Sequence, residues 1–124
     1  MPTLTEPMNL GDLLKYEAPN RYSREQATVA VGESLVLGSV VGRETANGKL
    51  KALDPVATDG TEIPVGVLIE DVEASAADTA VVIIARHALL ARQAIQWPAG
   101  ITPLQTTAAI AALEARGILV REGA

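Results

Sequence analysis

Short apolar segments alternate with turn-forming dipeptides over residues 28–95 of the chain. The clearest apolar segments are Leu35–Leu37, Val65–Ile69 and Val81–Ile84. The dipeptides that interrupt the pattern are Asn47-Gly48, Asp54-Pro55 and Asp59-Gly60. Because short β-rich runs bounded by such turns are typical of sandwiches and small barrels, the pattern predicts one of these two architectures.

The Asn47-Gly48 dipeptide carries a specific expectation. It suits the two positive φ angles of a type I′ turn, which predicts a hairpin between Val40–Ala46 and Lys49–Leu53. A two-residue turn at this point would pair Arg43 with Ala52.

A second expectation concerns the apolar run Thr79–Ala85. Its uninterrupted Val and Ile residues predict a strand buried on both faces, or buried on one face and in subunit contact on the other. Ala88–Ala91 has the composition of a helix but lies among strand-like segments, so both conformations stay open.

A C-terminal helix is predicted over about Pro103–Arg116. Thr102 can cap its N-terminus, Gln105 completes a capping box, and Gly117 suits the left-handed position after its end. Its polar residues are spread around an Ala-rich surface, which predicts contact on more than one side. We expect one side to face the domain's own sheet and the other a neighbouring subunit.

Residues 1–26 differ from the β-rich domain predicted over residues 27–124. They are rich in proline and hold most of the aromatic residues, with a short apolar patch that could form a helical turn. They could be a loose tail or an arm that orders on a partner. Tyr and Arg are enriched at interface anchors, which favours the arm. Its expected contact residues are Leu13, Leu14, Tyr16, Arg21, Tyr22 and Arg24.

Composition narrows the classes of partner. The net charge is −5 and the sequence pI is about 4.8, with no cluster of basic residues, which argues against nucleic acid and anionic membranes. The chain is 48% hydrophobic without a single Phe, and its mean hydropathy of +0.23 predicts apolar surface used in self-assembly. We recognise neither a signal peptide nor an apolar run long enough to span a bilayer.

Candidate chemistry is sparse. The chain has no Cys and a single histidine, His87, which excludes thiolate and multi-histidine metal sites. Gly42–Lys49 has the wrong spacing for a phosphate-binding loop, and Leu50 stands where a magnesium-binding Ser or Thr is needed. We therefore expect no enzymatic activity, no catalytic residue, no cofactor, no metal and no small-molecule substrate.

Taken in order, several elements resemble the bacteriophage head decoration protein family, the lambda-type decoration protein D and its relatives. The likeness covers about residues 20–121. It rests on Ser23-Arg24 before Thr28-Val29, Gly38-Ser39-Val40-Val41-Gly42, Asp54-Pro55-x-Ala57-x-Asp59-Gly60, Val65-Gly66-Val67-Leu68, Asp71-Val72, Ala77-Asp78, Val82 to Arg86-x-Ala88, Trp97-Pro98-Ala99-Gly100-Ile101-Thr102, Ala109-Ile110-Ala111-Ala112-Leu113 and Gly117-Ile118-x-Val120-Arg121.

The resemblance implies a non-enzymatic homotrimer with a compact, β-rich α+β fold. Family members bind the major capsid protein on the outside of the expanded icosahedral head, at local three-fold positions, and cement it. The resemblance also implies synthesis in the host cytoplasm and an N-terminal segment that adds a strand to the shell. The segment here is more apolar around Leu13-Leu14 than the Ser-, Thr- and Pro-rich arm of lambda.

For the subunit contact we expect Trp97, Ile110 and Leu113. The main alternative is a trimeric module of a phage tail, fibre or baseplate. A second alternative is a ligand-binding β-barrel that accompanies an enzyme, although the chain lacks a glycine-rich loop or an aromatic cage.

Overall fold

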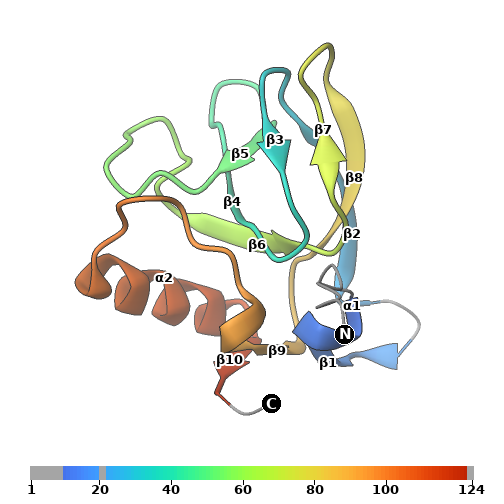
Figure 1. Cartoon of the computed structure of the whole chain (residues 1–124), viewed down its shortest axis with the longest axis vertical. Coiled ribbons are helices and arrows are strands. Elements are labelled where there is room, and N and C mark those ends of the chain that lie inside the picture. The colour runs from blue at the N-terminus through green and yellow to red at the C-terminus, as the bar shows by residue number, and fades with distance from the viewer. Residues whose placement is uncertain (1–9, 20–21, 123–124) are drawn as a thin grey trace, which may run out of the picture.

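The computed structural model describes residues 10–19 and 22–122. They form a small α+β domain, rich in strands and with a long helix near the C-terminal end, as the sequence predicts (Figure 1). The elements are α1 (Leu10–Leu13), β1 (Leu14–Glu17), β2 (Arg24–Val29), β3 (Ser34–Leu35), β4 (Val40–Arg43), β5 (Leu50–Ala52), β6 (Pro64–Leu68), β7 (Val72–Glu73), β8 (Thr79–Ile84), β9 (Ala88–Ala91), the 3₁₀ turn η2 (Arg92–Ala94), α2 (Pro103–Ala115) and β10 (Ile118–Arg121).

The central strands close into a barrel in the order β2-β5-β4-β6-β8, which selects the barrel from the two predicted architectures. Strands β3 and β7 pair separately beside it. Two glycines of the barrel strands lie against backbone of neighbouring segments. A Cβ at Gly42 would lie 2.5 Å from the carbonyl oxygen of Thr61, and one at Gly66 would lie 2.5 Å from that of Ile84. A side chain at Gly66 would push β6 and β8 apart, and one at Gly42 would displace the loop before β6.

The most apolar predicted strand, β8, lies between separate clusters of buried side chains. Val81 and Ile83 belong to a cluster formed by the barrel strands, together with Val29, Val41 and Leu50. Ile84 belongs to a second cluster, which α2 and β9 share. The strand is therefore buried on one face at Val81 and Ile83 and on the other at Ile84, whereas Val82 is half-buried and Ala80 is exposed.

The hairpin over residues 40–52 forms, but its predicted register is wrong. Arg43 pairs with Leu50 and not with Ala52. Gly48 has a positive φ of 72°, whereas Asn47 is not among the residues with positive φ, so the turn is not type I′. The amide of Gly48 instead donates to the carbonyl of Glu44 at 2.8 Å, and the wider loop shifts the pairing.

Aspartates brace the loops at the barrel's edge. Asp59 accepts hydrogen bonds from the hydroxyl and the amide of Thr61, which lower its pKa. Asp78 pairs with Lys49 and accepts a hydrogen bond from the amide of Val31, and these contacts lower its pKa as well. The acids at these turns are held in place by local hydrogen bonds.

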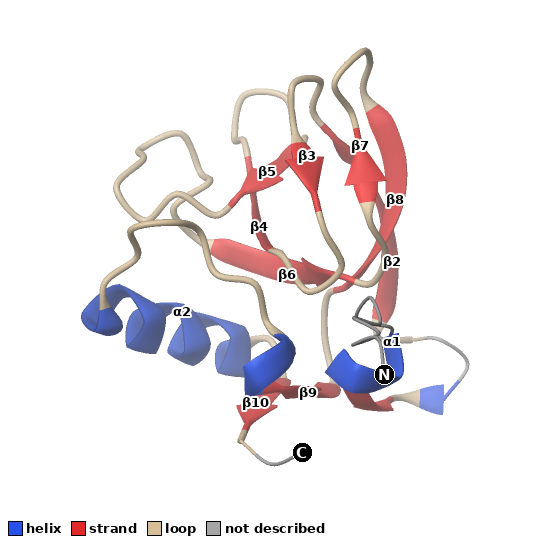
Figure 2. Ribbon diagram, in the orientation of Figure 1, coloured by secondary structure: helices blue, strands red, loops and turns tan. Residues whose placement is uncertain are grey.

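A second sheet lies at one end of the barrel, in the order β1-β9-β10 (Figure 2). We call it the terminal sheet. Strand β9 runs antiparallel to β1 and parallel to β10, so Ala88–Ala91 adopts the strand alternative. This sheet joins residues from both ends of the described chain.

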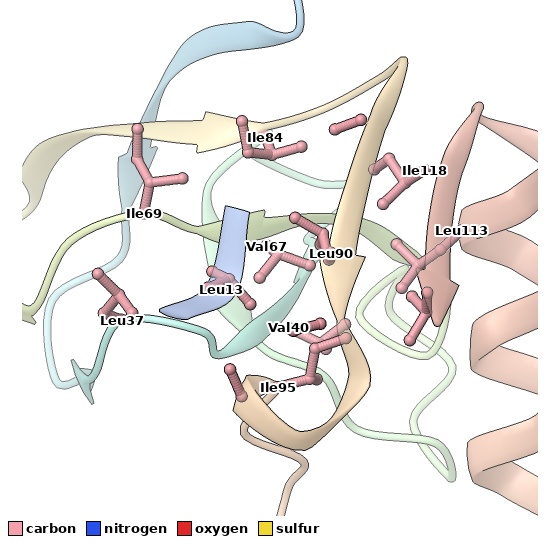
Figure 3. Close-up of a cluster of buried hydrophobic side chains, with 14 of the residues drawn as sticks. Leu13, Leu37, Val40, Val67, Ile69, Ile84, Leu90, Ile95, Leu113 and Ile118 are labelled. Atoms are coloured by element: carbon pink, nitrogen blue, oxygen red, sulfur yellow. The ribbon is translucent and has the colours of Figure 1, made fainter. Parts of the chain in front are cut away.

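The second cluster fills the space between the terminal sheet, α2 and the barrel (Figure 3). Leu13, Leu90, Leu113 and Ile118 are fully buried in it, beside Val67 of the barrel. Burial of this many aliphatic side chains is the main force that holds the terminal sheet on the barrel.

Helix α2 begins and ends where the sequence predicts. The Thr102 hydroxyl accepts from the Gln105 amide at 3.1 Å, and the Gln105 side chain accepts from the Thr102 amide at 3.0 Å. Gly117 follows the helix with a φ of 81°, and a Cβ there would lie 2.9 Å from Cδ2 of His87. The chain then continues directly into β10.

Candidate functional site

The outer face of the terminal sheet carries a row of exposed apolar side chains. Tyr16 of β1 and Leu119 of β10 both lie opposite Leu89 of β9, so the three residues share one face. Tyr16 is 57% exposed and Leu119 is 39% exposed, while Leu89 between them is half-buried. We call these three residues the outer row.

The outer row borders a shallow hollow of about 370 Å³. Its lining residues are Tyr16, Ala18, His87, Ala88, Leu89, Gly117 and Leu119. No lining residue is acidic, and His87 is the single side chain among them that can carry a positive charge. The hollow therefore suits an apolar surface rather than a charged ligand.

Ser23 fixes the N-terminal strand to this sheet. Its side chain is fully buried, and its hydroxyl accepts from the amide of Ala18 at 2.8 Å and donates to the carbonyl of His87 at 2.7 Å. Its carbonyl accepts from the amide of Ala85 at 2.8 Å. One small side chain thus ties the segment after β1 to the segment between β8 and β9.

An ion pair between Arg24 of β2 and Glu17 of β1 makes a second link between these parts of the chain. Arg24 donates from Nε and Nη2 to the two carboxylate oxygens of Glu17, each at 2.8 Å. These hydrogen bonds raise the pKa of Arg24 above its usual value. The two-pronged geometry orients β1 against β2 more firmly than a single contact would.

Tyr22 packs against Arg86 and against His87, which lines the hollow. Its ring meets the His87 ring edge-on with centroids 5.2 Å apart, and the Arg86 guanidinium lies 5.3 Å from the Tyr22 centroid. Arg86 also donates to the Tyr22 carbonyl at 2.7 Å and pairs with Glu25 at 2.8 Å. The ring is held in position while 55% of the residue stays exposed.

The residues predicted for the arm take different places in the structure. Tyr16 and Tyr22 are exposed, and Leu14 is half-buried. Leu13, by contrast, is fully buried in the second cluster and offers no surface to a partner in this conformation. Arg24 is engaged with Glu17, and Arg21 lies outside the described residues.

Residues 10–19 are therefore packed on the domain that the sequence analysis placed at residues 27–124. The reason is that α1 and β1 supply a buried side chain and backbone pairing to the terminal sheet. The role of residues 1–26 as a capsid-binding arm stays a prediction.

The residues predicted for the subunit contact are also separated. Leu113 is fully buried on the inner side of α2, where it packs within its own chain. Trp97 and Ile110 are partly buried against the second cluster and keep some exposed surface. Their contact with another subunit stays a prediction.

Sequence reasoning missed Leu89 and Leu119. A signal for Leu119 was present, because Ile118–Arg121 alternates apolar side chains that the structure buries with side chains that it exposes. Leu89 had no comparable signal, since Ala88–Ala91 is apolar throughout and does not show which side faces outward.

The described part of the chain offers little for chemistry. Within residues 10–19 and 22–122, no group of three or more His, Cys, Asp or Glu side chains is placed to hold a metal ion. No helix in these ranges is both long and apolar enough to cross a bilayer.

A match to a protein-family model decides which family the chain belongs to. The model of bacteriophage lambda head decoration protein D matches residues 3–118, which is nearly the whole chain. The chain belongs to this family. A comparison with curated proteins finds no significant match. Family membership makes the protein a phage head decoration protein, a structural class associated with the capsid.

Proposed function

We propose that this decoration protein acts as a homotrimer that binds the outside of the expanded icosahedral head at three-fold positions. There it contacts the major capsid protein and cements the shell, without enzymatic activity. The observation that carries the proposal is the exposed outer row on a member of the head decoration family.

The outer row has the anatomy of a protein contact. Its side chains are largely apolar and include a tyrosine, a residue enriched in binding hot spots. Nearby charges are engaged within the chain, as in the Glu17–Arg24 and Glu25–Arg86 pairs. A partner with a neutral, apolar surface would meet this face without leaving a charge unpaired.

Strand β1 supports the proposed strand addition. It pairs with β9 along one edge and stands at the end of the sheet order, so its other edge can receive a strand of the shell protein. Such addition supplies backbone hydrogen bonds without requiring a matched set of side chains. In this arrangement β1 stays docked on its own domain and extends the sheet toward the shell.

Trimer formation would convert weak contacts into firm attachment. Once one subunit is bound, the second and third bind at a high effective concentration. A trimer that binds the expanded lattice and not its precursor would stabilise the expanded state by mass action.

The direct test is to mix the purified protein with expanded, undecorated heads and to image them by cryo-electron microscopy. We expect density at three-fold positions with the terminal sheet toward the shell. A Tyr16→Asp, Leu119→Asp double variant should lose at least about tenfold in affinity, because it places charges in an apolar contact.

Val31→Asp is the matched control, since Val31 is 53% exposed but lies on the loop between β2 and β3, away from the terminal sheet (Figure 1). It should bind like the wild type. A wild-type protein that leaves the three-fold positions empty would overturn the proposal and favour the tail, fibre or baseplate alternative.

A further inference from the structure

The N-terminal half of α2 forms a ridge between hollows. One hollow, of about 770 Å³, is lined by Arg92, Gln93, Trp97, Ile101, Pro103, Thr106, Thr107 and Glu122. We call it the Trp97 hollow. A smaller hollow of about 180 Å³ lies against the helix residues Gln105, Ala108, Ala109 and Ala112 and includes Glu62 and Ile63.

Helical geometry places Leu104 on the crest of this ridge. With about 100° per residue, Leu104 points midway between the helix residues of the two hollows and away from the buried Leu113. Leu104 is 80% exposed, the largest exposed fraction among the large hydrophobic residues that the structure describes. An apolar knob thus stands directly beside a hollow that contains a tryptophan.

The Trp97 hollow carries one cation and one anion, and the far side of the ridge carries an anion. Arg92 is on the lining of the Trp97 hollow, and its side chain is 45% exposed. Its ion pair with Glu122, at 3.9 Å, is long, and Glu122 is 81% exposed at the same rim. On the other side of the ridge lies the carboxylate of Glu62, with one oxygen accepting from the amide of Gly60 at 2.8 Å.

We infer that Leu104 of one copy inserts into the Trp97 hollow of the next copy, so that Glu62 approaches Arg92 across the contact. This inference rests on the trimer in the proposed function and identifies its subunit contact. A closed ring needs two different patches that fit each other, which the ridge and the hollow provide. Since both patches adjoin the start of α2, the three-fold axis runs close to that end of the helix.

The proposed contact would cover Trp97 and Ile110, which are partly buried within their own chain. Trp97 would be covered by the neighbouring Leu104, and aromatic residues covered in this way are common binding hot spots. Ile110 lies on the flank of α2 that faces the Trp97 hollow by the same helical geometry. Leu113, on the inner side, would act by holding α2 in place.

Cysteine cross-linking tests the contact directly, because the chain has no native Cys. Leu104→Cys combined with Gln93→Cys should yield covalent trimers on mild oxidation, both in solution and on decorated heads. Either single variant can link at most two chains, so both cysteines are needed for a covalent ring of three, and mass spectrometry of the linked peptides should show the cysteine at position 104 joined to the one at position 93. Leu104→Cys combined with Val31→Cys is the control and should give no covalent trimer.

Sedimentation supplies a second readout. Leu104→Asp should raise the trimer dissociation constant about 30-fold or more while its melting temperature as an isolated chain stays unchanged. Val31→Asp should leave the dissociation constant as it is.

The outcomes separate the inference from the proposed function. Heads decorated by the wild type, with no covalent trimer from the cysteine pair and an unaltered Leu104→Asp trimer, would overturn the contact and leave the decoration function standing. Covalent trimers from a chain that does not bind heads would support the contact and overturn the function.

Discussion

The barrel and the terminal sheet both pair strands, but the strands of the terminal sheet lie farther apart in the sequence. The barrel draws its strands from residues 24–84 and is punctuated by turns that the sequence displays. The terminal sheet joins β1, β9 and β10, whose residues span positions 14–121. Ordering such distant strands costs loop-closure entropy before any contact is gained, so the terminal sheet needs the barrel beneath it.

The barrel and the terminal sheet also differ in the surface that they expose. The barrel encloses its own cluster of side chains, and each of its strands pairs with a neighbouring strand on both sides. The terminal sheet, as far as residues 10–19 and 22–122 show, has β1 and β10 as its end strands and carries an exposed outer row and a hollow. In this protein the region built from the most distant strands is also the region for which we propose a partner.

The two regions can be compared most directly by truncating one buried leucine in each, in the variants Leu13→Ala and Leu50→Ala. Both side chains are fully buried, Leu13 under the terminal sheet and Leu50 in the barrel cluster. Each truncation should cost about 2–5 kcal/mol of unfolding free energy through lost burial and a residual cavity. Urea unfolding measures this loss.

We expect both variants to unfold in a single transition, because barrel residues such as Val67 and Ile84 also belong to the second cluster. Trp97 packs against that cluster, so its fluorescence reports on the terminal region, while circular dichroism reports on the whole chain. A fluorescence transition of Leu13→Ala that precedes the dichroism transition would show that the terminal sheet unfolds on its own.

A smaller effect is expected from Ser23→Ala. The substitution leaves the carbonyl of His87 and the amide of Ala18 without their buried partner, which should cost about 1–3 kcal/mol. Hydrogen exchange of the β1 amides should accelerate in parallel. Ser34→Ala removes an exposed hydrogen bond to Glu73 and is the control, with an expected change within about 0.5 kcal/mol. Equal losses in the two variants would contradict a special role for Ser23.

The smallest effect is acid sensitivity of the barrel loops. Because hydrogen bonds lower the pKa of Asp59 and Asp78, the folded state keeps these carboxylates ionised at a pH where the unfolded chain has bound protons. Their contribution is present above the ordinary aspartate pKa of about 4 and is lost as the pH falls below it. The melting temperature of an Asp59→Asn, Asp78→Asn variant should therefore depend less steeply on pH in this range; an unchanged slope would contradict the assignment.

Local signals predicted much of the barrel and nearly all of α2. The Thr102–Gln105 capping box acts within one helical turn, and Gly117 meets a requirement of its own backbone. The hairpin register failed because Asn47 and Gly48 are compatible with more than one turn, and pairing across the barrel decides between them. The burial of Leu13 could not be predicted for a related reason, since an apolar residue near a terminus does not reveal whether a distant strand will cover it.

By itself, the sequence determined the kind of protein this is: an acidic, β-rich chain with a capped C-terminal helix and the ordered motifs of the head decoration family. Capping, turn preference and short-range alternation are local, so they can be recognised one segment at a time. Only the tertiary structure decided that Tyr16, Leu89 and Leu119 form one exposed row while Leu13 and Leu113 lie inside. Those assignments depend on which distant strand or helix covers each face, a choice made by packing the whole chain.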